Sequence, residues 1–418
     1  MPLLAGRSFL PIGLFARLPL AMLTVGTLTL VTSVTGSYAA GGVAAGAVGI
    51  GSALGAPVLG ALADRLGQRR VLLIAAVLNA TAVIALILAA YLIPGSQDLA
   101  AAIPVLATAF VAGASCPQVG PLARVRWMAL TSRNGPEANT ADLDTALSYE
   151  GTADELTFVL GPALVGILAS LVTPWLPLAL AAALTITLVP AFAVHPTHRA
   201  VPRTPARTAA AKNHARQLRT MNTPGQRTGA IAAVALPVLA MVCMGTFFGS
   251  TQTSLISFSA SFASSEAAGL LYAVMGLSSA AAALSVAYWP RGFTANARWL
   301  ACAALMSGLA LLLLLPGTVL PMVLVLLVLG LPVGPLMVTI FAVGGRVAPA
   351  GKLGTVMTVL ASGIVAGTAI GSSIAGQLAQ NHGHPTAFLV PVWAAAALFL
   401  LGAAAAVVLR QRKRTAAA

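Results

Sequence analysis

The stretch Gly60-Ala-Leu-Ala-Asp64-Arg65-Leu-Gly67-Gln-Arg69-Arg70 lies between two apolar runs, each long enough to cross a lipid bilayer. Gly67 permits a tight turn. The three arginines favour the cytosolic side of a membrane, because short cytosolic loops collect positive charge. The stretch therefore predicts a polytopic membrane protein in which a tight cytosolic loop joins the second and third spans.

The composition of the whole chain agrees with a membrane protein. Hydrophobic residues make up 58% of the sequence and charged residues 8%, against roughly a quarter charged in soluble domains. The mean hydropathy is +0.93. The net charge of +14 does not indicate nucleic-acid binding, because the bases sit in short loops between apolar runs. The three cysteines fall inside apolar runs, so we expect neither disulfides nor a metal site.

Apolar runs of about twenty residues predict an all-α membrane protein with twelve transmembrane helices. The expected spans are residues 11–36, 41–63, 71–93, 101–122, 149–172, 176–194, 229–256, 266–288, 299–315, 318–343, 354–379 and 386–409.

The distribution of bases supports this count. With a cytosolic N-terminus, every loop base falls on the cytosolic side, and only Arg17 lies within a span. Arg124 and Arg126 are then expected in the loop between the fourth and fifth spans. We expect a multi-pass protein of a bacterial inner membrane with both termini in the cytosol.

The two halves of the chain repeat a pattern. Val119-Gly-Pro-Leu recurs as Val333-Gly-Pro-Leu, and the spacing of Gly161 and Gly166 recurs at Gly371 and Gly376. Repeats of this kind are typical of transporters with two related halves around a central site. We expect a six-helix half over 1–194, a flexible basic linker over 195–228 and a second six-helix half over 229–418.

The opening stretch resembles the loop between helices 2 and 3 of the major facilitator superfamily. The resemblance implies that Asp64 ties the two halves together at the N-terminus of helix 11, near Gly354 and Thr355, where free N–H groups and a positive dipole are available. A nearby arginine, Arg124 or Arg126, is expected to complete the contact. The residues of this conformational latch are Gly60, Asp64, Arg65, Gly67, Arg69 and Arg70.

The fifth expected helix carries Gly161-Pro162-x-x-x-Gly166, which resembles the Gly-Pro motif of drug–proton antiporters in that superfamily. Proline kinks a helix, and glycines let a neighbouring helix approach closely. The chain lacks the second adjacent glycine of the family form, and ordinary close packing is the alternative interpretation.

The same helix holds three acids, Glu150, Asp154 and Glu155, within or at the edge of a span. Charged groups at that depth are costly and face a cavity or a partner. One interpretation is a proton-coupling site, with Asp154 first because it lies deeper than Glu150 and shares a helix face with Gly161, and with Glu155 second. The other is a structural ion pair with Arg17, Arg124 or Arg126. Arg17 is expected either to extend to the cytosol or to be the buried partner of these acids.

The resemblance implies a substrate cavity lined by the first and seventh spans. The side chains expected there are Thr27, Phe247, Phe248, Thr251 and Gln252. Hydroxyl groups in spans often bond only their own backbone, which is the alternative for the threonines. The position that often holds an arginine in the family's helix 4 corresponds to Ala109, so a proton pathway through that arginine is not expected here.

The sequence therefore predicts a secondary transporter, with proton-coupled efflux of small amphiphilic compounds as the expected activity. An uptake carrier for a sugar or another metabolite and a non-transporting receptor on the same fold are the alternatives. The chain has no phosphate-binding loop, catalytic triad or zinc-protease motif, so we expect neither enzymatic activity nor a cofactor. The expected partners are a small-molecule substrate, protons and the lipid bilayer, and the expected state is a monomer.

The predicted topology can be tested by cysteine labelling in a cysteine-free background. Cysteines replacing Gly95 and Gly383 should react with an impermeant reagent added outside, whereas a cysteine replacing Thr208 should not. External labelling at Thr208 would contradict the helix count.

Overall fold

A computed structural model describes residues 2–92, 99–132, 136–201, 224–261, 267–290 and 292–417. Over these residues the chain is helical and contains no strand. Twelve of its helical segments are long and apolar enough to cross a membrane, as the sequence predicted. Gly95 and Thr208 lie outside the described residues.

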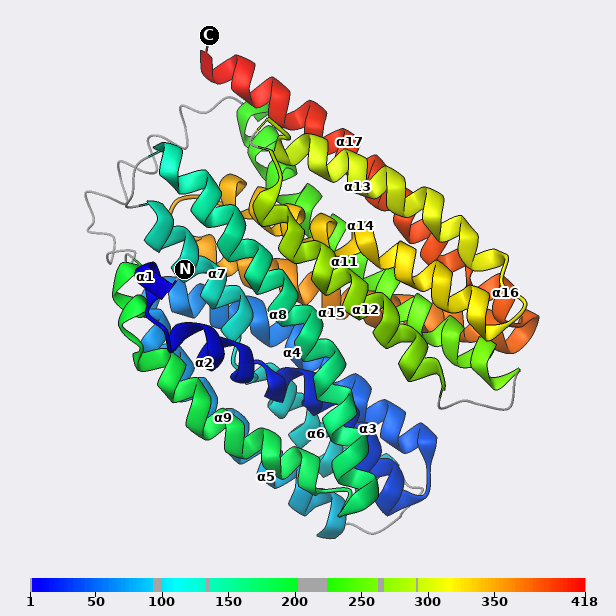
Figure 1. The fold of residues 1–418 in the computed structure, drawn as a ribbon. Coiled ribbons are helices and arrows are strands. Elements are labelled where there is room, and N and C mark those ends of the chain that lie inside the picture. Colours follow the sequence, from blue (N-terminus) through cyan, green and yellow to red (C-terminus); the bar gives the residue numbers. More distant parts are fainter. Residues whose placement is uncertain are drawn as a thin grey trace.

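The first half of the chain forms one helical bundle, drawn in blue to green in Figure 1. Its elements are α1 (Pro2–Ala5), α2 (Phe9–Phe15), α3 (Leu18–Thr35), α4 (Tyr38–Leu66), α5 (Gln68–Leu92), α6 (Leu99–Ala114), α7 (Val119–Thr131), α8 (Pro136–Leu171), α9 (Leu176–Val194) and the short 3₁₀ helix η2 (Pro196–Ala200).

The second half forms the other bundle, drawn in green to red. Its elements are α11 (Pro224–Ala260), α12 (Ala267–Ser285), η3 (Val286–Tyr288), α13 (Ala295–Ala310), η4 (Leu311–Leu314), α14 (Val319–Val347), α15 (Leu353–His382), α16 (His384–Ala387) and α17 (Leu389–Ala417). The two bundles meet along α4 with α15, α8 with α12 and α14, and α7 with α15.

Two expected spans are broken, and both breaks matter for the site. The first span divides into α2 and α3 at Ala16–Arg17, and the fourth divides into α6 and α7 at residues 115–118. After the second break the fourth span continues as α7 to Thr131, so the expected end at residue 122 is wrong. Arg124 and Arg126 therefore lie on α7 and are buried, and are not loop residues. The helix of the fifth span, α8, begins at Pro136, and the apolar span within it begins at Asp142, before the expected residue 149.

The connection between the halves is partly described. Residues 196–200 form η2, and α11 begins at Pro224, inside the expected linker of 195–228. Residues 202–223 lie outside the described part of the chain.

Small residues allow the closest helix crossings. A side chain at Gly367 of α15 would meet the carbonyl oxygen of Val242 on α11, and a side chain at Gly60 of α4 would meet Thr358 on α15. Helices in lipid associate through such close backbone contact, because apolar burial alone gains little there.

The close crossing of α11 and α15 predicts that Gly367→Ala destabilises the protein. The added methyl group meets the backbone of α11, and such overpacking costs about 1–3 kcal/mol. Gly308→Ala on α13 is the matched control, since nothing lies within 4 Å of the place that its added methyl group would take. Thermal unfolding in detergent measures both variants, and equal melting temperatures would contradict the packing described here.

Candidate functional site

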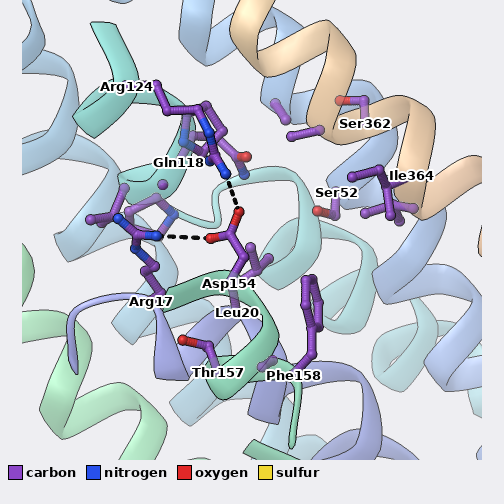
Figure 2. Close-up of a pocket in the computed structure, with 18 of the residues that line it drawn as sticks. Arg17, Leu20, Ser52, Gln118, Arg124, Asp154, Thr157, Phe158, Ser362 and Ile364 are labelled. Atoms are coloured by element: carbon purple, nitrogen blue, oxygen red, sulfur yellow. Dashed lines mark hydrogen bonds and ion pairs between the residues drawn. The ribbon is translucent and has the colours of Figure 1, made fainter. Parts of the chain in front are cut away.

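Four charged side chains meet near the middle of the first bundle. Arg17 pairs with Glu150 and, at 2.9 Å, with the Oδ1 atom of Asp154. Arg124 pairs with the Oδ2 atom of Asp154 at 2.6 Å. Figure 2 shows the Asp154 carboxylate lying between the two guanidinium groups. We call these four residues the charge cluster.

The breaks in the first and fourth spans bring the two arginines to this point. Arg17 occupies the break between α2 and α3, where its Nε atom donates to the carbonyl oxygen of Gly13 at 3.0 Å. Arg124 follows the break that precedes α7. Glu150 and Asp154 stand four residues apart on α8 and therefore share a helix face.

The two acids of the cluster differ in their surroundings. Glu150 has a side chain that is 1% exposed, and it also accepts a hydrogen bond from Trp127 Nε1 at 2.8 Å. The side chain of Asp154 is 18% exposed. Glu150 is therefore a fully satisfied structural partner, whereas Asp154 faces an open space.

That space is a cavity between the two bundles (Figure 2). Arg17, Arg124 and Asp154 form a polar wall, and the guanidinium of Arg124 lies 3.9 Å from the ring centroid of Phe341 on α14. The remaining lining is mostly apolar, with a few hydroxyl and amide groups: Leu20, Ala21, Ser52, Ala56, Pro117, Gln118, Val119, Gly120, Pro121, Thr157, Phe158, Ala361, Ser362, Ile364 and Val365.

Glu155 lies on another face of α8 and contacts the second bundle. Its Oε1 atom accepts a hydrogen bond from the Ser279 hydroxyl on α12 at 2.8 Å. One turn earlier, Thr152 donates to the carbonyl oxygen of Ala280 at 3.0 Å. Glu155 is 6% exposed, and no arginine or lysine among the described residues pairs with it.

Asp64 makes the contact that the resemblance implied. Its Oδ1 atom accepts from the backbone N–H of Gly354 at 2.8 Å, and its Oδ2 atom accepts from the N–H of Thr355 at 2.8 Å and its hydroxyl at 2.7 Å. The carboxylate thus caps the first turn of α15, where the helix dipole is positive. Gly67 ends α4 with φ of 89°, the left-handed region that favours glycine.

None of the arginines expected in or near the latch contacts Asp64 among the described residues. Arg65, Arg69 and Arg70 are exposed. Neither Arg124 nor Arg126 completes the Asp64 contact, because both are buried among other partners. The end of the molecule that carries these exposed arginines is called the basic end below.

An ion pair also joins the bundles at the basic end. Arg298 on α13 pairs with Asp144 on α8 at 2.9 Å. Next to it, apolar residues of both bundles pack in one cluster that contains Leu147, Ala283, Val286, Val338 and Ala342. The described structure is therefore closed between the bundles at its basic end.

Arg126, one of the arginines expected to pair with the acids, serves another contact. It donates to Gln68 Oε1 at 2.8 Å and to the carbonyl oxygen of Phe192 at 2.7 Å, and it reaches the Thr197 hydroxyl of η2. His195 lies beside this group, outside the spans. Partial burial and the nearby Arg126 cation lower the pKa of His195. Arg126 therefore fixes the end of α9 and the start of the connection.

The residues expected to line the substrate cavity do not line the cavity beside the charge cluster. Thr27 is buried and bonds the carbonyl oxygen of Leu23, as the backbone alternative predicted. Phe247 belongs to the core of the second bundle, with Phe248 packed against that core. Thr251 is buried, and Gln252 is exposed.

The Gly-Pro motif lies farther along α8. A side chain at Gly161 would meet Ala21 of α3, whereas nothing lies within 4 Å of the corresponding position at Gly166. The helix continues through Pro162 without interruption. Close packing against α3 accounts for the first glycine.

Several lining residues were not predicted from the sequence. Gln118 and Pro117 enter through the break in the fourth span, and Phe341 and Ser362 come from the second bundle. Polar residues within apolar runs were the sequence signal that could have indicated such lining residues. The direction in which their side chains point depends on the rotation of each helix about its axis. Among the described residues, no group of His, Cys, Asp and Glu side chains is arranged to hold a metal ion.

The family model described as "Major Facilitator Superfamily" matches residues 9–359 of the chain. The chain belongs to the major facilitator superfamily. No curated relative matches it.

Solved structures of the same fold are similar to nearly the whole chain. A bacterial homologue of the iron transporter ferroportin, in an outward-facing state, is 15% identical with a TM-score of 0.71, covering 96% of this chain and 98% of that one. The human organic anion transporter MFSD10 is 20% identical with a TM-score of 0.65, covering 94% and 98%. The E. coli fucose:proton symporter FucP is 16% identical with a TM-score of 0.62, covering 96% and 99%. At these identities the likeness shows the fold.

The Asp64 contact predicts that Asp64→Asn opens the basic end more often. The amide loses the charge that favours the N-terminus of α15, and a loss of about 1.4 kcal/mol shifts a two-state equilibrium about tenfold. A single cysteine replacing the buried Met357 should then be alkylated several-fold faster. Arg70→Gln is the matched control, because Arg70 is exposed in the first turn of α5, close to Asp64 in the chain. Equal alkylation rates in the wild type and Asp64→Asn would leave Asp64 as an ordinary loop charge.

Proposed function

We propose that the chain is a proton-coupled secondary transporter that moves small amphiphilic compounds by alternating access. The observation that carries this proposal is a buried charge cluster forming one wall of a cavity between the two bundles. Buried charges within membrane spans are costly, and they mark substrate or proton pathways. The cavity's mostly apolar lining with a few polar groups suits an amphiphilic compound.

Alternating access requires contacts that can form and separate at one end of the molecule. The Asp64 contact, the pair of Asp144 with Arg298 and the α8–α12 contact all join the two bundles. The positive-inside rule places the basic end in the cytosol. The described state is then closed toward the cytosol, and transport requires these contacts to separate.

The contacts favour Glu155 as the proton-binding acid over Asp154, which the sequence ranked first. Asp154 is held by two arginines, and Glu150 by Arg17 and Trp127. Glu155 has no cationic partner among the described residues, and an isolated buried carboxylate is costly unless it is neutralised. Because Glu155 touches Ser279 of the other bundle, separation of the bundles brings water to it and allows proton exchange.

For the direction of transport we keep the prediction made from the sequence, which is efflux. The predicted membrane is a bacterial inner membrane, and the predicted state is a monomer. The resemblance of the Gly161–Gly166 motif to drug–proton antiporters supports efflux. Flux measurements in proteoliposomes with an inward, an outward and no pH gradient distinguish efflux from the two alternatives, which are uptake of a metabolite and a non-transporting role. A pH-independent flux, or no flux of any compound, would contradict the proposal.

Neutralising the acids of α8 tests the proton site. Glu155→Gln should fold normally and lose gradient-driven transport, because an amide keeps the Ser279 contact but carries no proton. Glu150→Gln should instead lower the melting temperature together with every transport mode, since removal of a buried ion-pair partner costs about 3 kcal/mol or more. Asp142→Asn is the control at the start of the same span. Uphill transport by a folded Glu155→Gln variant would exclude Glu155 as the coupling acid.

A further inference from the structure

We infer that the substrate is an organic anion, with a carboxylate or similar acidic group that binds Arg124 and an apolar body that fills the rest of the cavity. This inference rests on the proposed transport function and specifies the substrate class of the same cavity. It follows from the hydrogen bonds that the charge cluster makes and those that it leaves unmade.

Arg124 has donors to spare at the cavity wall. A guanidinium carries five N–H groups. The described contacts of Arg124 are one ion pair, from its Nη2 atom to Asp154, and the ring of Phe341 beneath it. Its Nε atom is buried and has no hydrogen-bond partner among the described residues, while the residue is 1% exposed. Its Nη1 atom has no hydrogen-bond partner among the described residues either, and Arg124 lines the cavity, so an acceptor supplied by a ligand is favoured there.

The acids of the cluster already have cationic partners, although the Asp154 side chain is 18% exposed at the cavity wall. Both oxygens of Asp154 accept from guanidinium groups, and Glu150 accepts from Arg17 and from Trp127. A cationic substrate would have to compete with two arginines for the one charge of Asp154 and would be repelled by both. An anionic group needs only the unused donors of Arg124, and guanidinium groups bind carboxylates with well-matched geometry.

The remaining cavity wall fits the apolar part of such a compound. Leu20 and Phe158 come from the first bundle, and Ile364 and Val365 come from α15 of the second. Phe341, on which Arg124 rests, also belongs to the second bundle. An anion bound to Arg124 therefore contacts both bundles, so its binding bears on their separation.

Charge balance links this substrate to the proton. Arg17 and Arg124 are balanced by Glu150 and Asp154, so the cluster is neutral without a ligand. A bound monoanion adds one negative charge in a site of low dielectric, which favours protonation of Glu155, the residue that follows Asp154 on α8. Substrate and proton then occupy the same loaded state, which is cotransport. With a proton gradient directed into the cell this is uptake, so the inference keeps proton-coupled transport but replaces the exchange and efflux expected from the antiporter resemblance.

The test compares three probes that share one apolar body: 4-phenylbutyrate, 4-phenylbutylamine and 4-phenylbutanol. Binding to the purified full-length protein near neutral pH is followed by the rise in melting temperature. The acid should bind about tenfold or more tightly than the amine or the alcohol, which corresponds to roughly 1.4 kcal/mol or more. Equal or tighter binding of the amine or the alcohol would overturn the inference.

Two variants separate recognition from a structural role. In Asp154→Asn, Arg124 loses its acidic partner, so the variant should be less stable than the wild type but should gain more stability from 4-phenylbutyrate. The Arg124→Gln/Asp154→Asn double variant keeps the pair of Arg17 with Glu150 and should lose the preference for the acid. Retained preference in the double variant would overturn the inference. Proton-dependent flux of a cation or a neutral compound would leave the proposed function standing while excluding the anionic substrate.

Discussion

The rest of the structure depends on the two ion pairs that the Asp154 carboxylate makes with Arg17 and Arg124. Two arginines within the spans of a membrane protein are costly unless each has an acidic partner. The chain meets this requirement by breaking two spans, so that Arg17 lies in the break directly before α3 and Arg124 lies on α7 after the second break. The same breaks admit Gln118 and Pro117 to the cavity wall.

The contacts between the bundles differ in chemistry from the ion pairs of the charge cluster. Asp64 binds backbone N–H groups of α15, Thr152 binds a backbone carbonyl of α12, and Glu155 binds one hydroxyl group. Each of these contacts can be replaced by water when the bundles separate. The charge cluster, by contrast, lies wholly within the first bundle, so the polar wall persists while Phe341 and Ser362 of the second bundle move relative to it. This division suits a site that binds a ligand in one state and releases it in another.

The sequence predicted the features that follow from local patterns. The hydropathy of the sequence predicted the twelve spans. The loop motif predicted the contact of Asp64 with Gly354 and Thr355, because a helix N-terminus offers free N–H groups at a fixed place. The pairing of Arg17 with the acids of α8 was one of the two interpretations left open, and the structure shows it.

Features that depend on tertiary packing were not predictable in the same way. The break at residues 115–118 lies in an apolar run that continues on both sides, so the sequence places Arg124 in a loop. Both aromatic and polar residues of the seventh span are expected at the cavity, yet Gln252 is exposed and Phe247 lies in the core. The rotation of a helix about its axis is set by its neighbours, and hydroxyl groups that bond their own backbone, as Thr27 does, carry no signal about it.

The central claim is that substrate and proton bind together because the charge cluster is neutral before either arrives. The most direct measurement is the number of protons taken up when 4-phenylbutyrate binds, obtained by titration calorimetry in buffers of different ionisation enthalpy. Proton uptake that accompanies binding, and that disappears in Glu155→Gln, is the result expected from the charge balance. Binding without any proton uptake, or with proton release, would contradict it.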